Sequence, residues 1–408
     1  MNSAASTRGG VAAWVVIGAG VAAALHVGKL SPALPVLSEA LGVTLLQAGF
    51  LLSLVQLAGM TLGLLVGLSA DSLGLKRSMI GGLLLLTLAS LLGGWARDAQ
   101  TLLLLRAVEG LGFLLVSMPA PSLIRLLVPP QRMRAMLGLW GAYMPLGTAL
   151  ALLCGPLVIS LAGWSFWWWL LAAITSAMAV WVMQSVPADR HRTVQAAEQV
   201  PSPGWWDRLS QTLRAPGPWL VALSFAMYSG QWLAVIGFLP TIYAQAGVAG
   251  GLSAVLTALV AGVNMVGNIA SGRLLGRGVK PQILLYTGFS VMGLGTLLAF
   301  AVWPMSADGA GLPAVLRFVA VLLFSMLGGM IPGTLFSLAV RLAPGSGTVS
   351  TTVGWMQQWA SFGQFAGPPL VAWVASCVGG WHWTWGVTGV CSVIGLSLAV
   401  QLGRRSAA

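Results

Sequence analysis

The chain has 408 residues, of which 57% are hydrophobic and only 7% are charged. Soluble domains carry about 25% charged residues, so this composition excludes a soluble globular protein. The apolar runs are long and continuous, whereas the strands of a membrane β-barrel alternate in polarity, so a barrel is excluded as well. We therefore expect an all-α integral membrane protein.

Twelve apolar runs, each long enough to cross a bilayer as a helix, follow one another along the chain. The first six lie near 11–37, 45–70, 77–97, 101–127, 134–162 and 165–186. The other six lie near 217–244, 251–275, 281–304, 313–340, 348–377 and 383–403. We predict a six-helix bundle over 1–186, a hydrophilic cytoplasmic loop over 187–216 and a second six-helix bundle over 217–408. Within the loop, the Trp-Trp-Asp-Arg-Leu stretch at 205–209 predicts a short helix lying in the membrane interface.

The basic residues indicate the orientation of the chain. With the N-terminus inside the cell, 16 of the 20 Lys and Arg residues fall at cytoplasmic ends of spans. Positively charged loops stay on the cytoplasmic side, so we expect both termini there. This distribution accounts for most of the +12 net charge without a nucleic-acid partner. The apolar run after Arg8 is similar to a signal peptide. We nevertheless expect that it is not cleaved, because it continues through Pro35 and belongs to the repeat described in the next paragraph.

The two halves repeat each other in order. Pro35 and Pro240 lie 205 positions apart, and Arg106 and Arg317, which begin the fourth and tenth spans, lie 211 apart. A slowly growing offset is what loop insertions in a duplicated unit produce. Two parallel six-span halves are typical of secondary transporters, whose substrate site lies between the halves near the middle of the membrane.

Two motifs resemble those of the major facilitator superfamily. Residues 67–77, Gly-Leu-Ser-Ala-Asp-Ser-Leu-Gly-Leu-Lys-Arg, resemble its loop signature Gly-x-x-x-Asp-x-x-Gly-x-(Lys/Arg)-(Lys/Arg). Residues 106–112, Arg-Ala-Val-Glu-Gly-Leu-Gly, resemble its span-4 motif Arg-x-x-x-Gly-x-Gly. The resemblance covers essentially the whole chain and implies two pseudo-symmetric six-helix bundles that transport by alternating access. Ser72 and Leu75 depart from the pattern, as does Gly276, which stands where the acidic residue would repeat in the second half.

The first motif implies a cytoplasmic latch between the halves. By similarity to the superfamily, we expect Asp71 to pair with Arg125 and to face the start of span 11, near 346–351. These contacts would hold the halves together in the outward-open state. The alternative is a loop that only fixes the topology. The expected latch residues are Gly67, Asp71, Gly74, Lys76, Arg77 and Arg125.

Four ionisable residues lie at bilayer depth, where a charge is costly unless it faces a partner or a cavity. His26 and Lys29 are three positions apart in span 1, and Arg106 and Glu109 are three apart in span 4, so each pair shares a helix face. The resemblance implies that these spans line the central cavity. Their formal charge is positive, which favours a small anion. Two alternatives are that Lys29 reaches the outer interface and that Arg106 only pairs with Glu109. Glu109 and His26 are the candidate proton carriers.

Polar and aromatic side chains on other spans are expected to complete the substrate site, because such walls suit a small organic ligand. Gln231 lies 205 positions after His26 and is its counterpart in the repeat. The alternative for these residues is helix packing. The Trp-rich runs at 164–169 and 381–385 are expected in interfacial belts. Together with Lys29, His26 and Arg106, the predicted substrate-binding residues are Tyr143, Gln231, Asn264, Trp355 and Gln358.

The sequence offers no signal for catalysis or a cofactor. It has no Gly-x-x-x-x-Gly-Lys-(Ser/Thr) nucleotide loop and no clustered catalytic groups, so we do not expect an enzyme. Cys154, Cys377 and Cys391 lie in apolar runs without metal-ligand spacing, and we expect them to be small core residues.

We predict a monomeric secondary transporter of the bacterial inner membrane that moves a small organic or inorganic anion, with proton coupling as a hypothesis. Within the superfamily, the chain is similar to bacterial permeases of the cyanate and nitroimidazole type and to organic-anion carriers. The alternative is a multidrug or metabolite efflux antiporter. Pumps for cationic drugs need an acidic cavity, and here Glu109 is the single candidate carboxylate.

Overall fold

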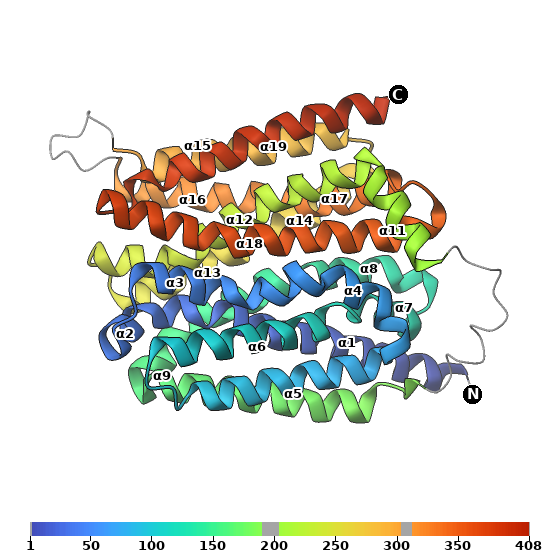
Figure 1. Ribbon diagram of the computed structural model, residues 1–408, viewed down its shortest axis with the longest axis horizontal. Helices are drawn as coiled ribbons and strands as arrows, with labels where there is room; N and C mark the ends of the chain where they lie inside the picture. Colours follow the sequence, from blue (N-terminus) through green and yellow to red (C-terminus); the bar gives the residue numbers. More distant parts are fainter. Residues whose placement is uncertain (1, 190–203, 303–311, 408) are drawn as a thin grey trace.

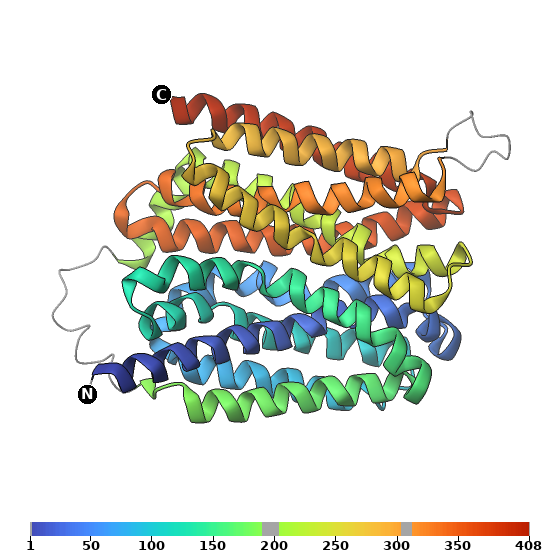
Figure 2. The same cartoon turned by 180° about the vertical axis from the view of Figure 1, so that it is seen from behind.

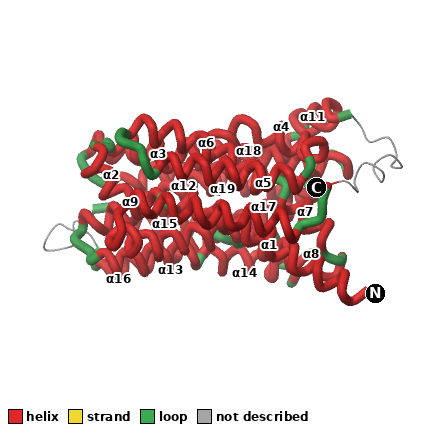
Figure 3. The backbone as a smooth tube through the Cα atoms, turned by 90° about the horizontal axis from the view of Figure 1, so that it is seen from below, coloured by secondary structure: helices red, strands yellow, loops and turns green. Residues whose placement is uncertain are grey.

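The structure is a computed structural model, and it describes residues 2–189, 204–302 and 312–407. Within these ranges the description leaves out the side chains of 2–9, 66–73, 130–131, 134–135, 346 and 406–407. The described chain is helical with no strand, which confirms the predicted all-α class (Figure 3).

The helices lie side by side along the long axis of the molecule in two bundles (Figures 1 and 2). The first half of the chain forms the lower bundle of Figure 1, and the second half forms the upper one. Both chain ends lie at the same end of the helices. This arrangement agrees with termini on one side of a membrane; which side is cytoplasmic stays a prediction, as do the domain bounds.

The described residues of the first half form ten helical elements. They are α1 (Asn2–Gly28), α2 (Leu30–Leu41), α3 (Leu45–Ser53), the 3₁₀ turn η1 (Leu54–Gln56), α4 (Leu57–Leu73), α5 (Leu75–Gly93), α6 (Ala99–Ser117), α7 (Ala120–Leu127), α8 (Pro130–Gly141) and α9 (Tyr143–Ser185).

The second half is built in the same way. Its helices are α11 (Trp205–Arg214), α12 (Pro216–Gln245), α13 (Gly250–Gly262), α14 (Asn264–Gly276), α15 (Pro281–Phe300), α16 (Ala314–Gly328), α17 (Met330–Arg341), α18 (Val349–Val378) and α19 (Thr384–Ala407), with 3₁₀ turns η4 (Ser346–Thr348) and η5 (Trp381–Trp383). Helix α11 confirms the short helix predicted within the central loop; its place in the membrane interface stays a prediction.

Ten described helical segments are long and apolar enough to cross a membrane. One of them, α9, has 43 residues, which is about twice the length that spans a bilayer. It is interrupted at Gly163, whose φ of 83° is non-helical, so α9 consists of two arms. Helix α18 has 30 residues but is less apolar and is not among the ten. These two features agree with twelve spans, although the full count stays a prediction.

Several spans are broken near their middle, and the first break has a clear cause. Helix α1 ends at Gly28 and α2 begins at Leu30. The ring of Pro32 clashes with the carbonyl four residues earlier, which is that of Gly28, and Pro32 has no N–H to donate. The break therefore falls at Lys29, one turn before the prolines.

Two of the three cysteines are not where the sequence analysis expected them. Cys154 and Cys377 are exposed on the protein surface, and Cys391 is partly exposed. In a membrane protein the lipid-facing surface is as apolar as the core, so an apolar run does not distinguish the two positions. The expectation of core cysteines was therefore wrong.

The two halves pack along an antiparallel pair of spans. Gly49 in α3 lies against the backbone of Pro369 in α18, where a β-carbon would come within 2.8 Å of the Pro369 Cα. Further along, the Leu64 N–H of α4 donates to Gln358 Oε1 at 3.1 Å. Small residues allow such close approach between membrane helices.

Helices α12 and α18 cross so closely that Gly363 cannot carry a side chain. A β-carbon there would lie 2.2 Å from the carbonyl oxygen of Ala226. We expect Gly363→Ala to lower the free energy of unfolding by about 1–3 kcal/mol. Gly389→Ala in α19 is the control, because its β-carbon would meet nothing within 4 Å, and it should be neutral or raise stability by up to about 1 kcal/mol. Thermal unfolding in detergent measures both; equal midpoints would contradict the expectation.

Candidate anion site in the first helix bundle

Lys29 lies at the break in the first span and points into the bundle. Its side chain is 0% exposed. The ammonium donates to Ser90 Oγ on α5 at 3.1 Å and to Glu109 Oε1 on α6. It also lies 4.7 Å from the ring centroid of Trp168 on the second arm of α9. In this structure the ammonium is therefore held inside the bundle and does not reach the outer interface.

Arg106 ties together the ends of two broken helices. Its Nε donates to the carbonyl of Leu51 at 2.9 Å, and Nη2 donates to the carbonyl of Val27 at 3.2 Å. Nη1 donates to the carbonyl of His26 as well. The last carbonyls of a helix lack intrahelical partners and attract cations. Because α1 ends at Gly28 and α3 ends at Ser53, Arg106 satisfies carbonyls that these breaks set free.

Glu109 bridges the two cations. Its Oε2 accepts from Arg106 Nη1 at 2.7 Å, while Oε1 accepts from Lys29. His26 Nδ1 lies 3.6 Å from Glu109 Oε1, and His26 Nε2 has no hydrogen-bond partner among the described residues. With a neutral imidazole, the cluster holds two positive charges and one negative charge, all at most 2% exposed. One positive charge is left without a counter-charge.

The cluster is closed in this conformation. A cavity of about 10 Å³ lies beside Lys29 and Glu109 and is closed by the apolar side chains of Leu30, Leu51 and Leu102. A single water needs about this volume, so no anion fits without movement. The described residues that hydrogen-bond the cluster or line its cavity all belong to the first half of the chain, so this part of the predicted site lies inside one bundle.

Sequence reasoning missed two members of the site. Ser90 is a single hydroxyl in an apolar span, and nothing in the sequence pairs it with Lys29. The Trp run at 164–169 was expected in an interfacial belt, yet Trp167 and Trp168 are each 2% exposed. The indole of Trp167 donates to the Lys29 carbonyl at 3.2 Å. The belt expectation was wrong for these two residues, because hydropathy cannot distinguish a membrane boundary from a helix contact.

The other predicted substrate residues do not join this cluster. Tyr143 stacks on Trp140 with ring centroids 4.1 Å apart. Gln231, the counterpart of His26, accepts from Ser392 Oγ on α19 at 3.1 Å. The repeat position therefore carries a neutral hydrogen bond in the second half and a charged cluster in the first.

Three further predicted residues make packing contacts. Asn264 hydrogen bonds Tyr228 Oη, with its Nδ2 at 3.0 Å. Trp355 packs edge-on against Trp219 at 4.8 Å between centroids. Gln358 makes the contact between the two halves described above. The described structure does not gather these residues around one pocket, and their role in binding stays a prediction.

The sequence profile of the Major Facilitator Superfamily matches residues 15–362. The chain belongs to this superfamily. This membership confirms the resemblance carried by its sequence motifs.

Several other proteins are similar to this chain in sequence. It is 31% identical over 244 residues to the methylenomycin A resistance protein of Streptomyces coelicolor, covering 57% of this chain and 47% of that protein. It is 34% identical over 160 residues to a puromycin resistance protein of Streptomyces alboniger, and the match covers 39% of this chain and 31% of that protein. It is 26% identical to plastidic glucose transporter 4 of Arabidopsis thaliana, and the match covers 82% of this chain and 68% of that protein. The chain thus spans less than half the length of the first two relatives.

A solved structure shares the superfamily fold over nearly the whole chain. It is a bacterial homologue of the human lysosomal transporter Spinster in an inward-facing, unoccupied conformation. The TM-score is 0.75 at 14% identity, and the match covers 99% of this chain and 98% of that one. At this identity the likeness establishes the fold alone.

The superfamily loop signature makes contacts that the sequence did not reveal. Gly74 has a φ of 82°, and a β-carbon there would lie 2.6 Å from Asp189 Oδ2. The Asp189 carboxylate accepts the backbone N–H groups of Lys76 at 3.1 Å and Arg77 at 3.2 Å, at the start of α5. Lys76 Nζ donates in turn to the carbonyl of Met183 at 2.7 Å, near the end of α9. The signature therefore joins the ends of α5 and α9.

The latch predicted around Asp71 is only partly described. The side chains of Gly67 and Asp71 lie outside the described residues, so the pairing of Asp71 with Arg125 stays a prediction. Arg125 is exposed at the end of α7.

The contact at Asp189 gives a stability prediction. The Asp189 carboxylate accepts backbone N–H groups at the start of α5, as an N-cap side chain does. Asp189→Ala should therefore lower the free energy of unfolding by about 1 kcal/mol. Glu39→Ala, at an exposed position near the end of α2, is the control and should be nearly neutral. Thermal unfolding of the purified variants measures the difference; a loss no larger than that of the control would argue against the cap.

Proposed function

We propose that this transporter moves a small organic or inorganic anion together with a proton, and that Lys29 binds the anion. The observation that supports the proposal is the single uncompensated positive charge of the buried cluster formed by His26, Lys29, Arg106 and Glu109. We further propose that the protein acts as a monomer in a bacterial inner membrane with both termini in the cytoplasm, because its basic residues concentrate at those ends.

Charge balance links the anion to the proton. An unpaired charge at bilayer depth costs several kcal/mol, so the cluster is more stable when neutral. It becomes neutral either when Lys29 loses its proton or when an anion binds beside a protonated Lys29. Binding of the anion therefore favours retention of the proton, and the two move together.

The geometry divides the roles between the two cations. Arg106 is held by three backbone carbonyls and by Glu109, so it positions the cluster and is not free to follow a ligand. Among the described residues, the Lys29 ammonium has only side-chain hydrogen-bond partners, in Ser90, Glu109 and His26. Opening of the Lys29–Glu109 contact exposes the ammonium to an anion, and it leaves Glu109 and His26 as proton acceptors.

Counterflow in proteoliposomes tests this function. Vesicles loaded with one candidate anion are diluted into a trace of the same labelled anion, with a panel of small carboxylates and inorganic oxyanions at an acid and a neutral pH. We expect exchange of at least one anion and net uptake that is faster when the outside is acid. Exchange of neutral or cationic compounds alone would contradict the proposal.

Efflux of antibiotics is the second candidate function. It is favoured by the relatives named as methylenomycin A and puromycin resistance proteins. Expression in a drug-sensitive host, compared with a Lys29→Ala variant, separates the two candidates. Resistance that persists without Lys29, combined with no anion exchange, would favour efflux.

A further inference from the structure

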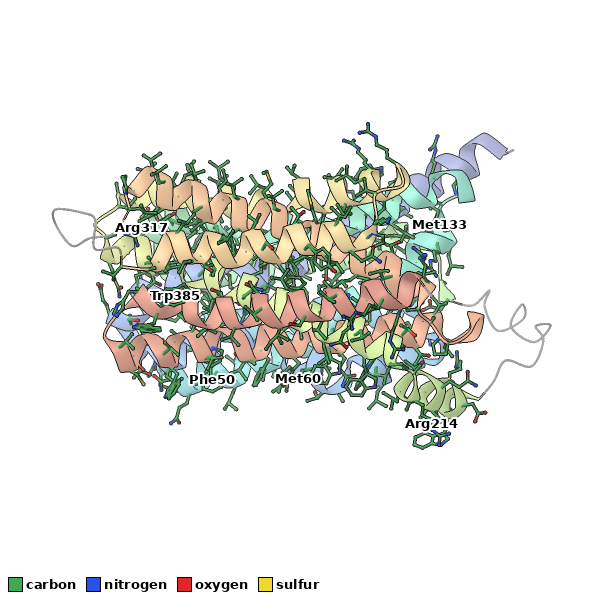
Figure 4. The ribbon with its side chains drawn as sticks, turned by 90° about the horizontal axis from the view of Figure 1, so that it is seen from above. Phe50, Met60, Met133, Arg214, Arg317 and Trp385 are labelled. Carbon is green, nitrogen blue, oxygen red and sulfur yellow. The ribbon has the colours of Figure 1, made fainter. Side chains whose placement is uncertain are left out.

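A second cavity lies at the end of the helices opposite the chain termini. Its volume is about 320 Å³, within the range of small-molecule sites. It is formed by the ends of α12 and α15, the start of α16 and the turn η5. Figure 4 shows Arg317 at this end of the molecule. The polar and aromatic residues that line it are Gln245, Phe300, Arg317, Trp381 and His382.

Among the described residues, Arg317 brings a cation to this cavity without a carboxylate partner. Its Nε donates to the Ala299 carbonyl at 2.6 Å, in the last turn of α15, which orients the guanidinium. Its two terminal amino groups have no hydrogen-bond partner, and no carboxylate lies within 4 Å, among the described residues. Arg106, at the same position of the repeat, differs because Glu109 follows it by three residues. The residue three after Arg317 is the buried Ala320.

The remaining lining groups suit an anion that carries an apolar part. Trp381 Nε1 donates to Gln245 Oε1 at 2.7 Å. This bond uses the amide oxygen of Gln245 and leaves its NH₂ group as a donor. The indole of Trp381 packs against Phe238 at 4.9 Å between centroids, which holds it in place. His382 adds ring nitrogens, and Phe300 and Trp381 supply aromatic walls. Trp381 lines the cavity, and the interfacial belt expected for it stays a prediction.

We infer that this cavity is a second anion site, in which Arg317 binds the carboxylate or phosphate group of a small aromatic or aliphatic anion. A guanidinium pairs with either group through two parallel hydrogen bonds. The ligand is either a dissolved organic anion or the phosphate of a lipid headgroup. The inference does not depend on the role proposed for Lys29, because it concerns binding within the second bundle.

Fluorine NMR of 4-fluorobenzoate with protein in phosphatidylcholine nanodiscs tests the site. All proteins carry Lys29→Ala, so that the first-bundle cluster contributes no binding. We expect Arg317→Gln to weaken binding of the probe by about tenfold or more, the effect of losing a charged hydrogen bond. Arg317→Lys should keep a part of the affinity, which shows that the fold is intact. Arg341→Gln, at the other end of the same span, is the control and should bind as its parent does.

A second arm identifies the source of the anion. Repeating the titration in nanodiscs that contain phosphatidylglycerol shows whether a headgroup competes. Binding that weakens in the parent but not in Arg317→Gln assigns the site to an anionic lipid headgroup, because repulsion of the probe by the negative disc surface would weaken both. Unchanged binding assigns the site to dissolved anions. Equal binding by Arg317→Gln and its parent in both discs would overturn the inference, as would a loss in Arg341→Gln of the same size.

Discussion

Lys29→Ala is expected to abolish anion counterflow and accumulation while the protein still folds. The substitution removes the uncompensated charge and leaves Arg106 and Glu109 as a balanced buried pair. Lys29→Arg should retain part of the activity, because it keeps a cation at the break between α1 and α2. Transport by wild type and both variants is measured in proteoliposomes with the anion that counterflow identifies.

Protein quality is the control for this comparison. Size-exclusion profiles and thermal unfolding should show Lys29→Ala to be close to wild type, since the remaining cluster is electrically neutral. Equal transport by wild type, Lys29→Arg and Lys29→Ala would exclude Lys29 as the anion-binding residue. A variant that is inactive only because it is unfolded would be recognised by its profile, and Lys29→Gln would then provide the neutral replacement.

Glu109→Gln, unlike Lys29→Ala, is expected to cause a large loss in the stability of the folded protein. It leaves Lys29 and Arg106 buried side by side without a counter-charge. Removal of one partner from a buried ion pair typically costs about 3–5 kcal/mol. The free energy of unfolding, or the yield of folded protein where unfolding is not reversible, measures the loss. Glu39→Gln, at an exposed acid on α2, should be nearly neutral.

A double variant tests whether charge is the cause. Lys29→Met combined with Glu109→Gln removes one cation with the anion, and Arg106 keeps its three backbone carbonyls. We expect this variant to be more stable than Glu109→Gln alone, with a coupling energy of about 1–3 kcal/mol. A Glu109→Gln protein as stable as Glu39→Gln would contradict the charge balance on which the proposed function depends.

The sequence predicted those parts of the fold that rest on composition and short-range spacing. The long apolar runs predicted the helices, and the regular offset between repeated residues predicted that the chain has two similar halves. The i, i+3 spacing of His26 with Lys29, and of Arg106 with Glu109, correctly put each pair on one helix face. Contacts between the two pairs could be expected only from the resemblance to a known family, because 80 positions separate Lys29 from Glu109.

The remainder of the site depends on three-dimensional packing that no local pattern encodes. Arg106 could be expected to pair with Glu109, but its carbonyl contacts exist only because α1 and α3 break at the same depth. Trp168 reaches Lys29 from a distant part of the chain. Gln358 and Trp355 were predicted from residue type alone, and their contacts between helices could not be predicted in that way; their role in binding stays a prediction.

The most direct test of the account is whether water and anion reach Lys29 during transport. Ser90→Cys places a thiol beside the ammonium, at the position of a hydroxyl now 3.1 Å from Nζ, in a protein whose three native cysteines are replaced. The account predicts that a small membrane-impermeant thiol reagent modifies this cysteine from at least one face of the membrane, and that the transported anion slows the reaction. A thiol that never reacts while the protein transports, or one that reacts at the same rate with and without the anion, would contradict it.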